Sequence, residues 1–190
     1  MTPRSAGRLV GLVLVVAIGA LAAGGTFFVL NRATGRSDSI FSVVDITQTV
    51  LGAAAFLATG SLLSAKRPAN AVGWLCLALG ILGCVLWAGT QYAAYAVVTH
   101  RGSLPGGVGI AVASAASFAP FLALIVFLVI LFPDGRLPSA RWRAVPVAGV
   151  VGFALLYAIG LTNKLSAPFA AVDNPLHVKD SRLQIGRAHV

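Results

Sequence analysis

The sequence has little of the charge that a water-soluble protein needs. Only 10% of its 190 residues are charged, Glu is absent, and all five acidic residues are Asp. A soluble domain carries roughly 25% charged residues. Because 58% of the residues are hydrophobic and the mean hydropathy is +0.91, the composition excludes an ordinary soluble domain. It indicates a protein whose solvent is lipid.

Cysteine is also scarce, and the placement of the two cysteines argues against a redox or metal site. Cys76 and Cys84 are the only two cysteines, and both fall in one apolar run. Eight residues of helix rise about 12 Å, which is too far for a disulfide between them. No further metal-ligating residues accompany them. We therefore expect both cysteines to act as small apolar side chains, and we expect no metal site.

The net charge of +9 comes from basic residues in the short gaps between apolar runs. Membrane proteins place Lys and Arg in this way, next to anionic lipid headgroups. No surface of interleaved basic and aromatic residues and no nucleic-acid-binding motif occurs. The lipid bilayer is therefore the expected partner, and nucleic acid is not.

Five apolar runs are long enough to cross a bilayer as helices, which takes about 20 residues each. They are residues 9–30, 43–64, 71–98, 108–132 and 144–161. The runs are continuous, whereas barrel strands alternate apolar and polar residues, and helices satisfy their own backbone hydrogen bonds in lipid. The predicted fold is therefore all-α and integral to the membrane, a bundle of about five transmembrane helices within residues 1–162.

Three details of these runs carry their own predictions. The first run has an alternative interpretation as a secretory signal peptide cleaved after Ala22, but it continues through Leu30, which favours a retained helix. Pro120 predicts a kink in the fourth run. The small residues of Gly7-xxx-Gly11 and Ala20-xxx-Gly24 permit close helix packing, within the bundle or in a dimer.

Lys and Arg in the loops predict the orientation. The N-terminus and the gaps after the second and fourth runs hold seven basic residues, whereas the other two gaps hold three. The tail adds Lys164, Lys179 and Arg182 to the second group, but it is not a closed loop and therefore carries less weight. We therefore expect a cytoplasmic N-terminus and an extracytoplasmic loop at residues 163–184.

Polar residues near the outer ends of the second and third runs are candidates for ligand sensing. Asp45 and Gln48 lie at the start of the second run, and Gln91 and Tyr95 lie at the end of the third. Ionisable groups within membrane helices are candidate functional sites. The alternative is that Asp45 only stabilises a helix N-terminus among the headgroups.

The most distinctive local motif is LFPDGRLPSARWR at residues 131–143. Pro-Asp-Gly favours a tight turn, and basic residues around a Trp form a headgroup anchor. The motif thus predicts a cytoplasmic hairpin turn between two membrane helices. Its residues of interest are Pro133, Asp134, Gly135, Arg136, Pro138, Arg141, Trp142 and Arg143.

A second basic turn, KRPAN at residues 66–70, leads into VGWL, so that the chain reads RPANAVGWLCLALG before LFPDGRLPSARWR. This pairing resembles the N-terminal membrane region of sensor histidine kinases of the actinobacterial type. In that family an RPxNxxGWL start is followed two helices later by LFPDGRLPSxRWR and then by an NPLG-type segment. Asn174-Pro175-Leu176 stands at that place, with His177 in place of the glycine.

The resemblance implies the membrane-embedded sensory or anchoring region of a two-component sensor kinase in a bacterial plasma membrane. It implies a homodimeric full-length protein that uses ATP and Mg and acts on a response regulator through domains beyond this chain. No cofactor and no catalytic residue is expected within the chain itself. His100 and His177 both fall in predicted outer loops, so neither is a phosphoacceptor.

The last six residues, IGRAHV at 185–190, resemble a translated sequencing adapter. We therefore expect the gene to continue past Gln184 and the chain to be a fragment that stops before the kinase domains. If this ending is genuine, the alternatives are a small multi-pass transport component or a structural membrane protein without catalysis.

Overall fold

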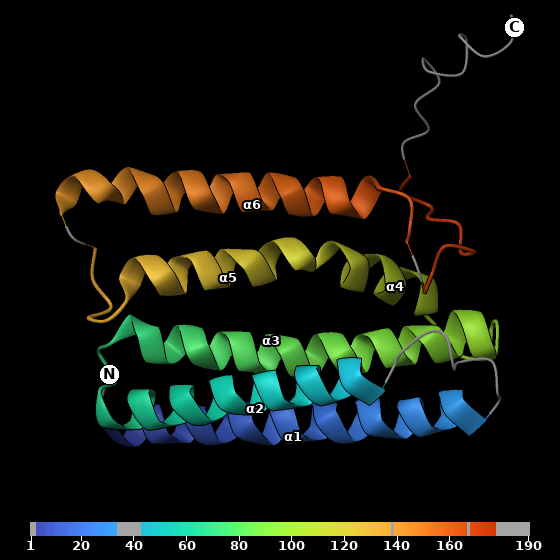
Figure 1. The fold of residues 1–190 in the computed structure, drawn as a ribbon, viewed down its shortest axis with the longest axis horizontal. Coiled ribbons are helices and arrows are strands. Elements are labelled where there is room, and N and C mark those ends of the chain that lie inside the picture. The colour runs from blue at the N-terminus through green and yellow to red at the C-terminus, as the bar shows by residue number, and fades with distance from the viewer. Residues whose placement is uncertain (1–2, 34–42, 138, 167, 178–190) are drawn as a thin grey trace, which may run out of the picture.

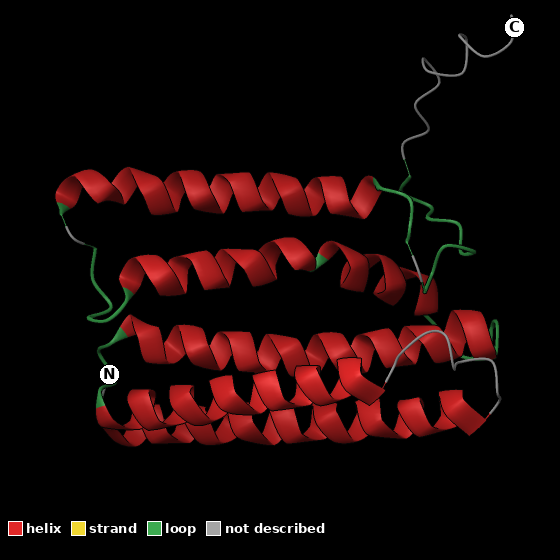
Figure 2. Ribbon diagram, viewed as in Figure 1, coloured by secondary structure: helices red, strands yellow, loops and turns green. Residues whose placement is uncertain are grey.

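The computed structural model describes residues 3–33, 43–137, 139–166 and 168–177. Within these residues every regular element is a helix (Figure 2). The long α-helices are α1 (Pro3–Ala33), α2 (Val43–Lys66), α3 (Ala71–Ala93), α4 (Gly107–Ala116), α5 (Phe118–Leu131) and α6 (Ala144–Thr162). A π-helix, η1 (Ala94–Thr99), extends α3, and a short 3-10 helix, η2 (Ala140–Arg143), precedes α6.

These helices form five segments that are long and apolar enough to span a membrane: Arg4–Ala33, Ile46–Lys66, Ala71–Thr99, Gly107–Leu131 and Arg141–Thr162. Large apolar side chains on all five segments are exposed, among them Leu12, Leu51, Val85, Val129 and Leu155. Such a surface suits hydrocarbon and not water. The predicted all-α fold with about five transmembrane helices is therefore confirmed, and the chain is a multi-pass membrane protein.

The five spans alternate in direction, so their connections gather at two ends of the bundle (Figure 1). The N-terminus, the α2–α3 turn and the α5–α6 turn lie at one end, which we call the hairpin end. The α3–α4 turn and the segment after α6 lie at the opposite end. Both turns that carry the sequence resemblance are therefore at the same end of the molecule.

Helix α3 lies at the centre, in contact with α1, α2, α4 and α5. Three glycines allow it to approach α2 closely. A Cβ on Gly60 would lie 2.5 Å from the backbone nitrogen of Leu77, and a Cβ on Gly73 would lie 2.8 Å from that of Ser64. Gly80 meets Leu57 in the same way. Small residues at helix contacts let backbones approach in this manner, which is the usual basis of helix packing in lipid.

The two small-residue spacings of α1 differ in their surroundings. A Cβ on Gly24 would overlap the indole of Trp87 on α3, whereas Cβ atoms on Gly7 and Gly11 would meet nothing within 4 Å. Gly24 therefore serves packing inside the bundle, and the face at Gly7 and Gly11 is open.

The fourth span is broken into α4 and α5 at Ser117, three residues before Pro120. Pro120 has no N–H to donate to the carbonyl of Ala116, so the regular hydrogen-bond ladder fails one turn before the proline. The hydroxyl of Ser117 donates to the Ala113 carbonyl at 2.6 Å across the break. The predicted irregularity in this span thus lies at Ser117.

Candidate functional site

At the hairpin end, Asn70 joins the two turns that carry the sequence motifs. Its side-chain oxygen accepts a hydrogen bond from the Val72 N–H at 2.9 Å and so caps the start of α3. Its side-chain nitrogen donates to the carbonyl of Pro133 in the α5–α6 turn at 3.2 Å. The side-chain amide of Asn70 therefore caps α3 after the α2–α3 turn and also binds the α5–α6 turn.

Gly135 completes this contact from the α5–α6 turn. Its φ of +72° is a conformation that side chains disfavour. An added Cβ would also overlap the side-chain oxygen of Asn70 and lie 2.6 Å from the Ala71 nitrogen. Both the backbone conformation and the close approach require glycine, because the turn lies directly on the start of α3.

One further hydrogen bond fixes the surroundings of this contact, and a cleft lined by two arginines and one aspartate lies beside it. The indole N–H of Trp74 donates to the Pro68 carbonyl at 3.0 Å, which braces the α2–α3 turn. A cleft of about 650 Å³ lies beside the contact. Its lining residues are Arg67, Ala69, Asn70, Ile130, Phe132, Asp134, Arg136 and Leu137. The two motifs thus form a single surface, which we call the hairpin junction.

The other motif residues lie around the hairpin junction. Pro133, Asp134 and Arg136 are exposed in the turn itself. Arg141, Trp142 and Arg143 are exposed in η2, and Trp142 retains 46% of its accessible surface. Pro138 lies outside the described residues. An exposed Trp between two arginines suits the headgroup layer.

At the opposite end, the predicted sensing residue Gln91 is fully buried against α1. The side-chain nitrogen of Asn31 donates to the Gln91 carbonyl at 3.0 Å and to its side-chain oxygen at 3.3 Å. Thr99 in turn donates its hydroxyl hydrogen to the side-chain oxygen of Asn31 at 2.8 Å. These three buried residues link α1 to α3 and η1 through side-chain polar groups.

The other predicted sensing residues are placed differently. Tyr95 is half-buried, with its ring 5.6 Å from that of Phe27 and 4.5 Å from that of His100. Gln48 is exposed on α2, and the side chain of Asp45 lies outside the described residues. The structure therefore brings Gln91 and Tyr95 to the boundary of α1 and α3, without Gln48.

Asn31 is the member of this polar group that the sequence analysis missed. It is 2% exposed and lies in the last turn of α1. The sequence does hold a signal for Asn31, because it is an amide side chain at the end of a long apolar run, where polar groups need a partner. It was missed because the partner, Gln91, lies 60 residues further along the chain.

Two buried donors near this group have no hydrogen-bond acceptor among the described residues. They are the side-chain nitrogen of Gln91 and the indole nitrogen of Trp87, four residues apart on α3. Residues at this spacing share a helix face. Unpaired buried donors are costly, so this part of α3 carries an unfavourable polar contribution.

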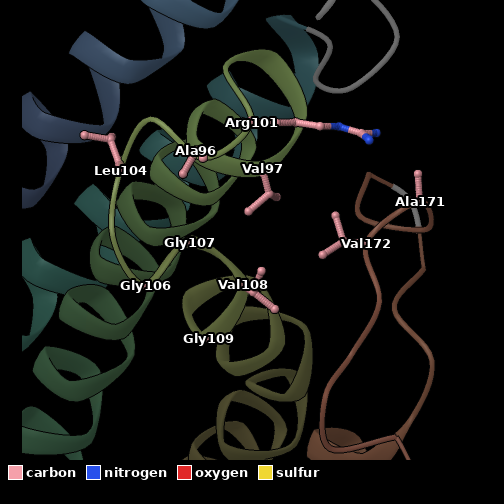
Figure 3. Close-up of a pocket in the computed structure, with 11 residues that line it drawn as sticks. Ala96, Val97, Arg101, Leu104, Gly106, Gly107, Val108, Gly109, Ala171 and Val172 are labelled. Carbon is pink, nitrogen blue, oxygen red and sulfur yellow. The ribbon is translucent and has the colours of Figure 1, made fainter.

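A cavity of about 390 Å³ lies at the opposite end, between the α3–α4 turn and the segment after α6 (Figure 3). In Figure 3, Val97 and Val108 lie on one side, with Ala171 and Val172 across from them. Among the residues that the structure describes, Arg101 is the one charged residue that lines it. Without a second polar side chain, the lining offers little to orient a ligand.

A further cleft of about 530 Å³ lies at membrane depth between α3, α5 and α6. Helix α6 approaches its neighbours closely at two glycines: Gly149 next to Phe127, and Gly160 next to Ala116. The cleft lies between these two contacts, and Leu82, Pro120, Ala123 and Tyr157 are among its lining residues. No residue of α6 is buried, so this helix is held less firmly than α3.

Among the described residues, no group of three or more His, Cys, Asp or Glu side chains could hold a metal ion. Cys76 and Cys84 are free and buried in α3. None of the clefts described above presents a nucleophile next to a base. Neither a family model, nor a curated protein, nor a solved structure matches this chain.

Proposed function

We propose that this chain is the membrane-embedded sensory and anchoring region of a two-component sensor histidine kinase. The observation that carries the proposal is the bond from Asn70 to the Pro133 carbonyl, with Gly135 packed on the same asparagine. The resemblance to these kinases rests on two motifs separated by about 60 residues. Their direct contact gives a physical reason for the two motifs to occur together, because each turn needs the other.

The proposal places the hairpin end on the cytoplasmic face of a bacterial plasma membrane. Basic residues in the short loops favour the cytoplasmic side. Those at the hairpin end are Arg4, Arg8, Lys66, Arg67, Arg136, Arg141 and Arg143, against Arg32, Arg101 and Lys164 at the opposite end among the residues that the structure describes. The kinase domains, with ATP and Mg, the homodimer contact and the response regulator all belong to the full-length protein.

In this proposal the bundle changes shape when a signal binds or the membrane changes. Such a switch needs two packings of similar free energy. Helix α6 is the element best suited to move, because it has no buried residue and borders an open cleft. Its N-terminal end follows the turn that Asn70 holds, so a shift of α6 would act on the hairpin junction.

The genomic DNA beyond codon 184 provides the first test. We expect a sixth span, then a helical hairpin with a phosphoacceptor histidine, and then an ATP-binding domain. A stop codon in the genome at that position would contradict the proposal and favour a small transport component or a structural protein.

Autophosphorylation of the full-length protein in membranes provides the second test. Asn70→Ala should change the rate severalfold, because it disconnects the two turns. Gly52→Ala on α2, where an added Cβ would meet nothing within 4 Å, is the control and should leave the rate unchanged. Equal rates for wild type and Asn70→Ala would contradict a role for the hairpin junction in signalling.

A further inference from the structure

We propose that the cleft of the hairpin junction binds one anionic phospholipid, with its phosphate between Arg67 and Arg136 and its acyl chains along Ile130 and Phe132. This inference does not depend on the kinase proposal. The cleft measures about 650 Å³ and is formed by both turns, since Arg67 precedes α3 and Arg136 follows α5. Its volume lies within the roughly 300–1,000 Å³ of small-molecule sites.

The protein neutralises only part of the charge of this cleft, because two arginines and one aspartate line it. Within the described part of the chain, neither Arg67 nor Arg136 forms a side-chain hydrogen bond or an ion pair, although Asp134 lines the same cleft. A guanidinium binds phosphate through two parallel hydrogen bonds. Two free arginines from separate turns therefore supply the groups that hold a phosphate.

The remaining lining explains why the ligand is a lipid and not a soluble anion. Ile130, Phe132 and Leu137 line the cleft beside the arginines. Phe132 is 70% exposed, and Val129, one turn earlier on α5, is 71% exposed. This apolar surface runs from the cleft onto the part of α5 that faces hydrocarbon. An amphiphile with an anionic head satisfies both parts, whereas a free phosphate leaves the apolar part uncovered.

A smaller neighbouring cleft of about 320 Å³ extends the site along the α5–α6 turn. It shares Arg136 and Leu137 with the first cleft and adds Ser139 and Arg143. A serine hydroxyl and a third arginine beside the phosphate suit a headgroup that carries hydroxyls. Phosphatidylglycerol is therefore the probe that matches the site best.

The bound lipid would stabilise the contact between the two turns. Asn70 connects them by one hydrogen bond to Pro133, and a phosphate held by Arg67 and Arg136 would add a second, charged connection. Binding to the folded state alone raises stability in proportion to the logarithm of ligand concentration. The lipid content of the membrane would then set how firmly α5 and α6 are held to α3.

The test is native mass spectrometry of the full chain purified in detergent, titrated with phosphatidylglycerol or phosphatidylcholine. We expect one retained phosphatidylglycerol and no retained phosphatidylcholine. The double variant Arg67→Gln/Arg136→Gln should weaken phosphatidylglycerol binding about 25-fold, at about fivefold for each arginine. Asp134→Asn should tighten binding by about fivefold, because it removes the acidic residue that lines the cleft among the described residues.

The matched control is Arg4→Gln/Arg8→Gln, which removes the same charge at the same end from residues that line neither cleft. It should weaken binding by at most about fivefold, because exposed charges beyond the cleft are screened. Equal losses in the two double variants would overturn the site. If Arg67→Gln/Arg136→Gln does not fold, the Asp134→Asn variant provides the test. Unchanged phosphatidylglycerol affinity in that variant would overturn the site. Displacement of the lipid by equimolar glycerol 1-phosphate would overturn the assignment to a lipid.

Discussion

Replacing Gly135 by alanine tests whether the α5–α6 turn lies on the start of α3. The substitution carries two separable costs. One is the φ of +72°, which costs a residue with a Cβ roughly 1–2 kcal/mol. The other is the contact with Asn70 and Ala71. Gly106 has the same φ of +72° with nothing within 4 Å of an added Cβ, so Gly106→Ala carries only the first cost.

The size of the second cost follows from the distances. The Cβ would lie 2.6 Å from the Ala71 nitrogen, whereas ordinary contacts begin at 3.4 Å, so the turn must shift by about 0.8 Å. That shift breaks the Asn70 bond to Pro133, worth about 0.5–1.5 kcal/mol, and disturbs the cap on α3, worth about 1 kcal/mol. We therefore expect Gly135→Ala to be less stable than Gly106→Ala by about 1–3 kcal/mol, which is also the range for overpacked sites.

The assay is equilibrium unfolding of the purified chain in mixed detergent and SDS, followed by circular dichroism and Trp fluorescence. A double-mutant cycle with Asn70→Ala should give a coupling of about 1 kcal/mol or more, because contacting residues are not additive. If Gly135→Ala unfolds at the same SDS fraction as Gly106→Ala, the turn does not contact Asn70 and the reasoning behind the hairpin junction fails.

Three further substitutions test the packing of the bundle in the same unfolding assay. Gly60→Ala should cost about 1–3 kcal/mol because its Cβ meets backbone atoms of α3, whereas Gly52→Ala, with nothing within 4 Å, should be neutral or slightly stabilising; equal stability would argue against the close α2–α3 approach. Asn31→Leu should cost about 1–3 kcal/mol because its buried partners lose their hydrogen bonds, and an unchanged midpoint would show that those bonds are not formed. Ala123→Leu should stabilise by about 0.5–2 kcal/mol by filling the membrane-depth cleft, whereas Ala158→Leu on the exposed face of α6 should not; no difference between them would mean that the cleft is already filled.

The sequence was sufficient to predict the helices, because their signal is local. A run such as residues 108–132 is too apolar and too long for any other element in lipid, and it corresponds to the span Gly107–Leu131. The break in that run was less predictable. Pro120 predicts which helical turn is interrupted. It does not predict that the Ser117 hydroxyl forms a hydrogen bond to the Ala113 carbonyl there.

The candidate sites were predictable only in part, because they depend on contacts between distant residues. Helical spacing placed Gln91 and Tyr95 near one another on the third span, and they do lie one turn apart. It did not indicate that Gln91 is buried against Asn31, since nothing local specifies which face of α3 meets α1. In the same way the two basic turns were visible in the sequence as separate hairpins. The bond from Asn70 to Pro133 spans 63 residues and has no local signature.

Close contacts between helices are more numerous among α1, α2 and α3 than around α6. In lipid the hydrophobic effect does not press helices together, so their association depends on packing and on polar contacts. Helices α1, α2 and α3 have both, through Gly60, Gly73 and the bonds of Asn31. Helix α6 has neither a buried residue nor a close contact other than those at Gly149 and Gly160. Its position relative to α3 is therefore set through α4 and α5, which it contacts, and through the connections at its two ends. At the hairpin end Asn70 makes that attachment, and so a change there would alter the position of α6 more readily than a change in the packing of α1 to α3.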